Sequence, residues 1–138
     1  MNHFVLDSSV ALAWCFEDET SPAGDRILDL LESAEAIVPV VWPTEVGNAL
    51  LAGERRRRIT AAGVSRSLAL LRSLNIRLDD SDPRLQVDDW VTLARRHSLS
   101  VYDAAYLAVA IREGVPLATF DRALARAAGQ AGVRLLQP

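Results

Sequence analysis

The sequence predicts an α/β fold with a mainly parallel central sheet of four to five strands and helices on both of its faces. Short apolar runs alternate along the chain with segments whose apolar residues recur at helical spacing, which is the pattern of repeated β-α units. The length of 138 residues fits one domain, so residues 1–138 are expected to share one core. Neither an internal repeat nor a long polar linker divides the sequence.

In the first half of the chain, apolar runs at 4–6 and 36–40 predict two strands. A helix is expected over 10–16, and Pro22 opens a second helical pattern between the two strands. Pro43 fits the first turn of a third helix. That helix ends in a run of basic residues, Arg55, Arg56, Arg57 and Arg58.

In the second half, Thr60 begins a helical stretch that precedes a short strand over 76–78, and Asp82-Pro83 signals the next helix start. A helix over 102–112 is expected to end at Gly114. The remaining elements are expected to be a strand at 115–120, a helix at 121–131 and a strand at 133–136.

Composition limits the class of protein. No apolar run is long enough to cross a bilayer and no secretory signal pattern is present, so we expect a cytoplasmic protein without a membrane partner. Cys15 is the single cysteine and cannot form an internal disulfide. The net charge of −3 does not favour nucleic-acid binding by the molecule as a whole. The run Arg55–Arg58 either contacts RNA phosphates, to which the planar guanidinium is suited, or reflects codon bias in a chain without lysine.

Four carboxylates stand where predicted strands end or helices begin: Asp7, Glu45, Asp103 and Asp121. Taken singly, Asp7 and Asp121 could cap the helices that follow them, and Glu45 could be stabilised by its helix dipole. Asp103 resists this interpretation, because residues three, four and seven positions later form the apolar stripe of its helix. An ionised carboxylate on that stripe needs a partner.

Ligands of parallel sheets bind beyond the carboxyl ends of the strands, so the four carboxylates are expected at one edge. They would repel one another there unless a cation neutralised them. Oxygen ligands favour Mg²⁺ or Mn²⁺, and the shortage of His and Cys argues against zinc. Ser9 and Thr119, each two residues from an aspartate, either support a ligand carboxylate or belong to turns.

Four segments follow one another in a specific order and spacing: Val5-Leu6-Asp7-Ser8-Ser9, Glu45, Tyr102-Asp103-Ala104-Ala105-Tyr106-Leu107-Ala108 and Ala118-Thr119-Phe120-Asp121-Arg122-Ala123-Leu124. Together they resemble the PIN-domain ribonucleases, and more narrowly the VapC-type toxins of toxin–antitoxin modules. The resemblance implies a three-layer α/β/α fold, a homodimer, and a metal-dependent endoribonuclease that hydrolyses RNA with a metal-activated water. It also implies a VapB-like antitoxin as partner.

By the same resemblance, Asp7, Glu45, Asp103 and Asp121 take the catalytic and metal-binding positions, and Ser9 and Thr119 the accompanying hydroxyl positions. The chain departs from many relatives after Asp121, where Arg122-Ala123-Leu124 supplies no further acid. One well-occupied ion and a weaker second are therefore expected.

Other functions remain open at this point. A receiver-like signalling module would also place an aspartate at a strand end, but such sites use a lysine, which this chain lacks. A haloacid-dehalogenase-like phosphatase requires a second aspartate where Ser9 stands, and no glycine-rich phosphate loop is present. A housekeeping PIN nuclease without an antitoxin, or an interaction protein with a decayed site, is the remaining alternative.

Overall fold

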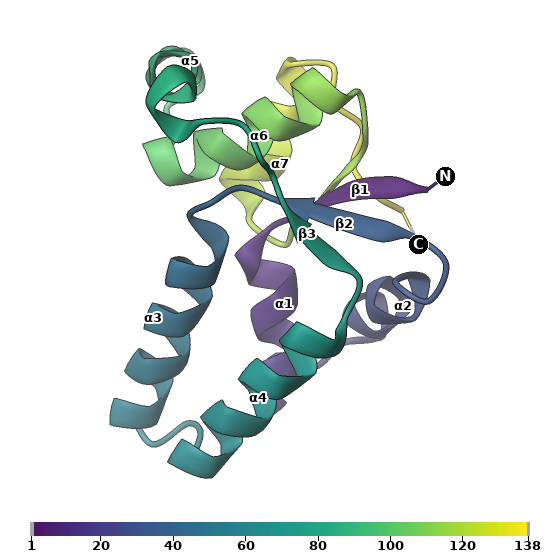
Figure 1. Ribbon diagram of the computed structural model, residues 1–138, viewed down its shortest axis with the longest axis vertical. Coiled ribbons are helices and arrows are strands. Elements are labelled where there is room, and N and C mark those ends of the chain that lie inside the picture. The colour runs from purple at the N-terminus through teal and green to yellow at the C-terminus, as the bar shows by residue number, and fades with distance from the viewer. Residues whose placement is uncertain (1, 138) are drawn as a thin grey trace.

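The computed structural model describes residues 2–137, in which strands and helices alternate (Figure 1). The strands are β1 (His3–Leu6), β2 (Glu35–Val38), β3 (Ile76–Leu78) and β4 (Leu117–Ala118). The helices are α1 (Ser8–Cys15), α2 (Pro22–Leu30), α3 (Trp42–Arg55), α4 (Ala61–Ser73), α5 (Pro83–His97), α6 (Val101–Glu113) and α7 (Arg122–Gln130), with a 3₁₀ turn η1 (Glu17–Glu19) after α1. Within residues 2–137, none of the helices has the length and apolar character needed to span a membrane.

The four strands form one parallel sheet in the order β3-β2-β1-β4. Strand β1 lies inside the sheet, between β2 and β4, and its residues Phe4, Val5 and Leu6 are fully buried. A strand that is covered on both faces has a continuous apolar run, which is why this strand was visible in the sequence. The predicted α/β class and parallel sheet are confirmed.

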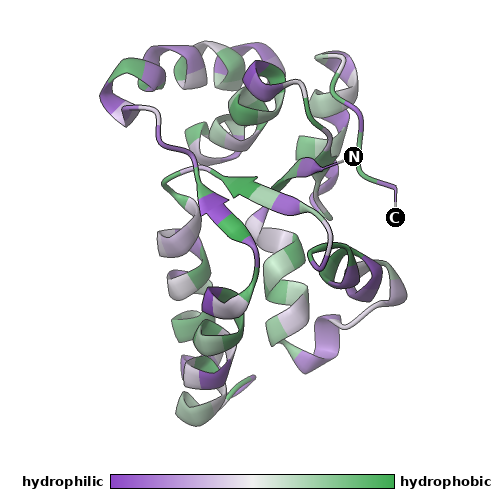
Figure 2. Cartoon of the chain, turned by 45° about the vertical axis from the view of Figure 1, so that its right-hand side comes forward, coloured by the Kyte–Doolittle hydropathy of each residue, from purple (hydrophilic) through white to green (hydrophobic). Residues whose placement is uncertain are grey.

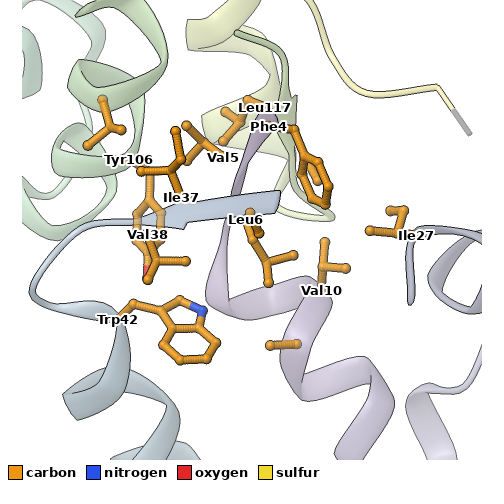
Figure 3. Close-up of a cluster of buried hydrophobic side chains, with 14 of the residues drawn as sticks. Phe4, Val5, Leu6, Val10, Ile27, Ile37, Val38, Trp42, Tyr106 and Leu117 are labelled. Carbon is orange, nitrogen blue, oxygen red and sulfur yellow. The ribbon is translucent and has the colours of Figure 1, made fainter. Parts of the chain in front are cut away.

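Helices cover both faces of this sheet (Figure 1). The helices α1, α2, α3 and α4 lie on one side, and α5, α6 and α7 lie on the other. Figure 2 shows that α1 and the central strands are mostly hydrophobic, whereas α5 alternates hydrophobic and strongly hydrophilic positions. Side chains of β1 and β2 meet those of α1, together with Trp42 and Tyr106, in one core (Figure 3). The three-layer prediction therefore agrees with the structure.

The strand expected over 133–136 is the clearest error in the predicted elements. Only Leu135 forms a bridge, to Leu117, and it is flanked by backbone hydrogen bonds from Leu117 N to Arg134 O and from Leu136 N to Leu117 O. Strand β4 is two residues long, so the edge of the sheet offers no longer partner. The apolar side chains of this segment pack against the core instead.

Helix boundaries place the ends of several helices at the same edge of the sheet. Helix α1 starts at Ser8, two residues earlier than expected, so Asp7 alone separates it from β1. Helix α6 begins after Ser100, whose hydroxyl accepts from the Asp103 N–H at 3.0 Å, and it ends at Gly114 as predicted. Gly114 adopts a φ of 66°, a conformation that glycine tolerates best. The carboxyl ends of β1 and β4 are thereby brought next to new helices.

Candidate active site

Asp7 is the most buried of the four carboxylates, with 3% of its surface exposed. It stands at the N-cap position of α1, but its side chain makes no capping hydrogen bond. Its Oδ2 instead accepts from the hydroxyls of Ser9 and Thr119, each at 2.7 Å. Among residues 2–137, no hydrogen bond to Asp7 Oδ1 is found. The capping interpretation therefore does not explain this aspartate.

Ser9 and Thr119 connect Asp7 to the segment that follows β4. The Ser9 hydroxyl oxygen accepts from the Phe120 N–H, and the Thr119 hydroxyl oxygen accepts from the Asp121 N–H, both at 3.0 Å. Each hydroxyl thus donates to the buried carboxylate and accepts from the backbone beyond β4. Two side chains that are 110 residues apart in sequence fix the relative positions of Asp7 and Asp121.

Asp121 does act as a helix cap, because its Oδ1 accepts from the Leu124 N–H at 3.0 Å at the start of α7. The capping interpretation is therefore correct for this residue. Its charge nevertheless acts on its neighbours, since it raises the pKa values of both Asp7 and Asp103. Asp121 caps α7 and belongs to the acidic group at the same time.

Glu45 comes from the first turn of α3 and is held by a buried residue of α6. The Tyr106 hydroxyl donates to Glu45 Oε1 at 2.5 Å, and Tyr106 itself has no exposed surface. Sequence reasoning placed Tyr106 only in the apolar stripe of its helix and missed this contact. Its spacing of three residues from Asp103 puts both side chains on one helix face, which was the available signal.

Asp103 is half-buried, and the residues Tyr106, Leu107 and Ala110 that follow on its side of α6 are buried, as the periodicity predicts. Its carboxylate accepts no hydrogen bond within the described chain, and no ion pair involves it there. The backbone N–H of Asp103, rather than its side chain, is engaged by Ser100. This carboxylate is consequently available to a ligand.

The four carboxylates influence one another electrostatically. Burial raises the pKa of Asp7, and the charge of Asp121 raises it further, against the lowering effect of the two hydroxyls. Burial also raises the pKa of Glu45, with added repulsion from Asp7 and Asp103. The pKa of Asp103 is raised by burial first and then by Asp7 and Asp121. No basic side chain within residues 2–137 forms an ion pair with any of the four.

This donor set fits a hard divalent cation. All the available ligand atoms are carboxylate oxygens, which Mg²⁺ and Mn²⁺ prefer, and one oxygen of the buried Asp7 has no hydrogen-bond partner. As the side chains stand, however, no group of three or more His, Cys, Asp or Glu residues between 2 and 137 is arranged to hold an ion. The site is an acidic cluster in which a cation would have to draw the carboxylates together.

The run Arg55–Arg58 lies away from this cluster. Glu45 and Arg55 are ten residues apart at opposite ends of α3, which corresponds to about 15 Å along the helix axis. The Arg58 guanidinium pairs with Asp18 at 2.8 Å and Glu19 at 2.7 Å and lies 4.1 Å from the centre of the Phe16 ring. Within the described residues no ion pair involves Arg55, Arg56 or Arg57, which are exposed.

Comparison with known proteins gives one family match: the PIN domain model matches residues 4–130. No curated protein matches the sequence. The fold is similar to that of PAE2754 from Pyrobaculum aerophilum, with a TM-score of 0.70 and 26% identity over 91% of this chain and 84% of that one.

Two further similar structures come from toxin–antitoxin systems. VapBC2 from Rickettsia felis, solved with a DNA fragment from its promoter, aligns with a TM-score of 0.69 and 12% identity over 97% of both chains. VapC20 from Mycobacterium tuberculosis, a toxin that cleaves the sarcin-ricin loop, aligns with a TM-score of 0.67 and 19% identity over 98% of this chain and 99% of that one.

Proposed function

The chain belongs to the PIN-domain family, and we propose that it is a metal-dependent endoribonuclease that hydrolyses RNA phosphodiester bonds. The observation that carries the proposal is the group of four mutually repelling carboxylates, Asp7, Glu45, Asp103 and Asp121, which have no basic partner within residues 2–137. Such an arrangement destabilises the folded protein unless a cation binds there.

In this proposal the four carboxylates hold Mg²⁺ or Mn²⁺. The bound ion supplies a Lewis acid that activates water and stabilises the leaving oxygen. Ser9 and Thr119 orient Asp7 through its Oδ2 and leave Oδ1 for the ion, and Tyr106 fixes Glu45. The segment after Asp121 contains no further acid, so we expect one ion to bind more tightly than a second.

We further propose that the protein is a toxin of the VapBC type, homodimeric and inhibited by a VapB-like antitoxin. The supporting observation is that chains similar in fold over nearly their full length include VapBC2 and VapC20. The alternative within the family is a housekeeping nuclease without an antitoxin. A small reading frame directly upstream that encodes a DNA-binding protein would favour the toxin, and purification of the two products as a complex would establish the partner.

The nuclease proposal is tested by incubating purified protein with structured RNAs, with and without Mg²⁺ or Mn²⁺. Asp7→Asn and Asp103→Asn should each reduce cleavage by at least about 100-fold, since loss of a ligand should exceed the ~10–100-fold effect of losing a supporting group. The matched control is Asp88→Asn, which removes an exposed acid of α5 and should cleave like the wild type. Equal cleavage by all four proteins would reject the proposal.

For the arginine run, we propose that Arg55, Arg56 and Arg57 contact RNA phosphates away from the cleavage site. Arg58 is less suited to this role because it is already paired with Asp18 and Glu19. Neutralising the three free arginines should weaken RNA binding and reduce its dependence on salt, because fewer counterions are released. Affinity measured over a range of salt concentrations checks this, and an unchanged slope would reject it.

A further inference from the structure

Exposed aromatic residues occur at only two positions. The chain has three tryptophans, two tyrosines and three phenylalanines, all of which lie in the described part of the structure. Only Tyr102 and Phe120 are exposed, with 60% and 43% of their surfaces accessible. Tyr102 directly precedes Asp103, and Phe120 directly precedes Asp121. Both exposed rings therefore flank carboxylates of the acidic cluster.

The backbone that carries each ring is fixed by the same hydrogen bonds that build the cluster. The Phe120 N–H donates to Ser9, whose hydroxyl also donates to Asp7. Tyr102 lies in the first turn of α6, which is capped by Ser100. Consecutive Cα atoms are only about 3.8 Å apart, so neither ring can lie far from its carboxylate. A rigid backbone lowers the entropy that each ring loses when it binds a ligand.

Core packing does not account for these two rings. Tyr102 makes no side-chain hydrogen bond within residues 2–137 and is mostly exposed. The ring of Phe120 lies near the first turns of α2, since a Cβ built on Gly24 would be 3.8 Å from Phe120 Cε2 and the same distance from Trp14 Nε1. One edge of the Phe120 ring is thus supported by α2, while much of the remaining surface faces solvent.

We propose that Tyr102 and Phe120 are stacking positions for unpaired RNA bases next to the scissile phosphate. The inference rests on the proposed nuclease function. Proteins that bind single-stranded RNA stack its bases on aromatic side chains, and loops and bulges are the parts of RNA whose bases are free to do so. The site therefore selects single-stranded or looped RNA over a continuous duplex.

The stacking is tested with an RNA whose cleavage position has first been mapped with the wild-type protein. Binding is measured in an Asp7→Asn background that does not cleave, and KM and kcat are measured in the active protein. Phe120→Ala and Tyr102→Ala should each weaken binding and raise KM by about 5- to 100-fold, the range that corresponds to loss of one stacked base. Phe120→Trp and Tyr102→Phe keep an aromatic face and should remain near the wild-type values.

Three controls separate stacking from other roles. Phe120→Leu keeps apolar bulk without an aromatic face and should behave like Phe120→Ala. Leu85→Ala removes a side chain that is 75% exposed on α5, away from the cluster, and should have no effect. An RNA with an abasic nucleotide beside the cleavage position should bind the wild type less tightly, and Phe120→Ala or Tyr102→Ala should add little further loss with that RNA.

The outcomes distinguish this inference from the function on which it rests. If the wild type cleaves RNA but the alanine variants bind and cleave as it does, or if their effects add fully to that of the abasic nucleotide, the stacking role is wrong and the nuclease stands. If the wild type cleaves no RNA with either metal, the nuclease proposal fails first. Equal melting temperatures of the variants would exclude a folding defect as the cause of any loss.

Discussion

At the carboxyl ends of β1 and β4 four acidic side chains stand together without a basic partner in the described chain, whereas at the turn between α3 and α4 Arg58 is paired with two acids and covers an aromatic ring. Both regions looked functional in the sequence, as clusters of like charge. The first keeps its charges uncompensated and partly buried, which raises the pKa values of three of its members. Neutralisation by a ligand is therefore needed only at the acidic cluster, and Arg58 serves the fold.

Removal of a hydroxyl from the acidic cluster should have the largest effect in this comparison. Thr119→Val preserves the shape of the side chain but removes a hydrogen bond to Asp7 and another from the Asp121 N–H. Metal affinity and RNA cleavage should fall by about 10–100-fold. Thr92→Val is the matched control, because the Thr92 hydroxyl donates only to the Asp88 carbonyl on the exposed side of α5. Similar activities for the two variants would show that Thr119 does not support the site.

A change at Arg58 should affect stability and leave catalysis intact. Arg58→Ala removes two ion pairs and the contact with Phe16, so the melting temperature should fall. Arg56→Ala, one turn away and without an ion pair in the described chain, should melt like the wild type. Cleavage of RNA should be unchanged by Arg58→Ala. Lost cleavage at an unchanged melting temperature would contradict the structural role of Arg58.

Much of the fold could be predicted because its elements carry strong local signals. The buried run Phe4-Val5-Leu6, the proline that opens α5 and Gly114 at the end of α6 each specify an element by burial or backbone conformation. The segment 133–136 was misassigned because its apolar pattern equally suits a packed extended chain. Strand pairing depends on the partner available, which local sequence does not reveal.

The candidate site was less visible than the fold. Asp7 and Asp121 have the same sequence context, yet only Asp121 makes the capping bond, because the Ser9 and Thr119 hydroxyls engage Asp7 instead. The contact between Tyr106 and Glu45 joins residues 61 positions apart and arises from the packing of α6 near α3. The pairing of Arg58 with η1 is also a long-range contact. Periodicity and spacing within one segment carry no information about such pairs.

The account's central claim is that repulsion among the carboxylates is relieved by a divalent cation, and Asp103→Asn isolates this effect. Without metal at pH 7 the variant should melt about 2 °C above the wild type, since removing a screened repulsion stabilises the fold by about 0.5 kcal/mol. The pKa of Asp103 is raised in the folded state, so the wild type takes up a proton more readily when folded. Its disadvantage should therefore disappear as the pH falls toward the ordinary value of 3.8.

The most direct measurement is the melting temperature of wild type and Asp103→Asn at pH 7 during titration with Mn²⁺. At an ion concentration about 100 times the dissociation constant, the wild type should gain about 2.7 kcal/mol, which corresponds to roughly 8–12 °C. Asp103→Asn should start higher and gain much less, so that the two curves cross. Parallel curves, in which Mn²⁺ stabilises both proteins equally or neither, would contradict a cation site built from these carboxylates.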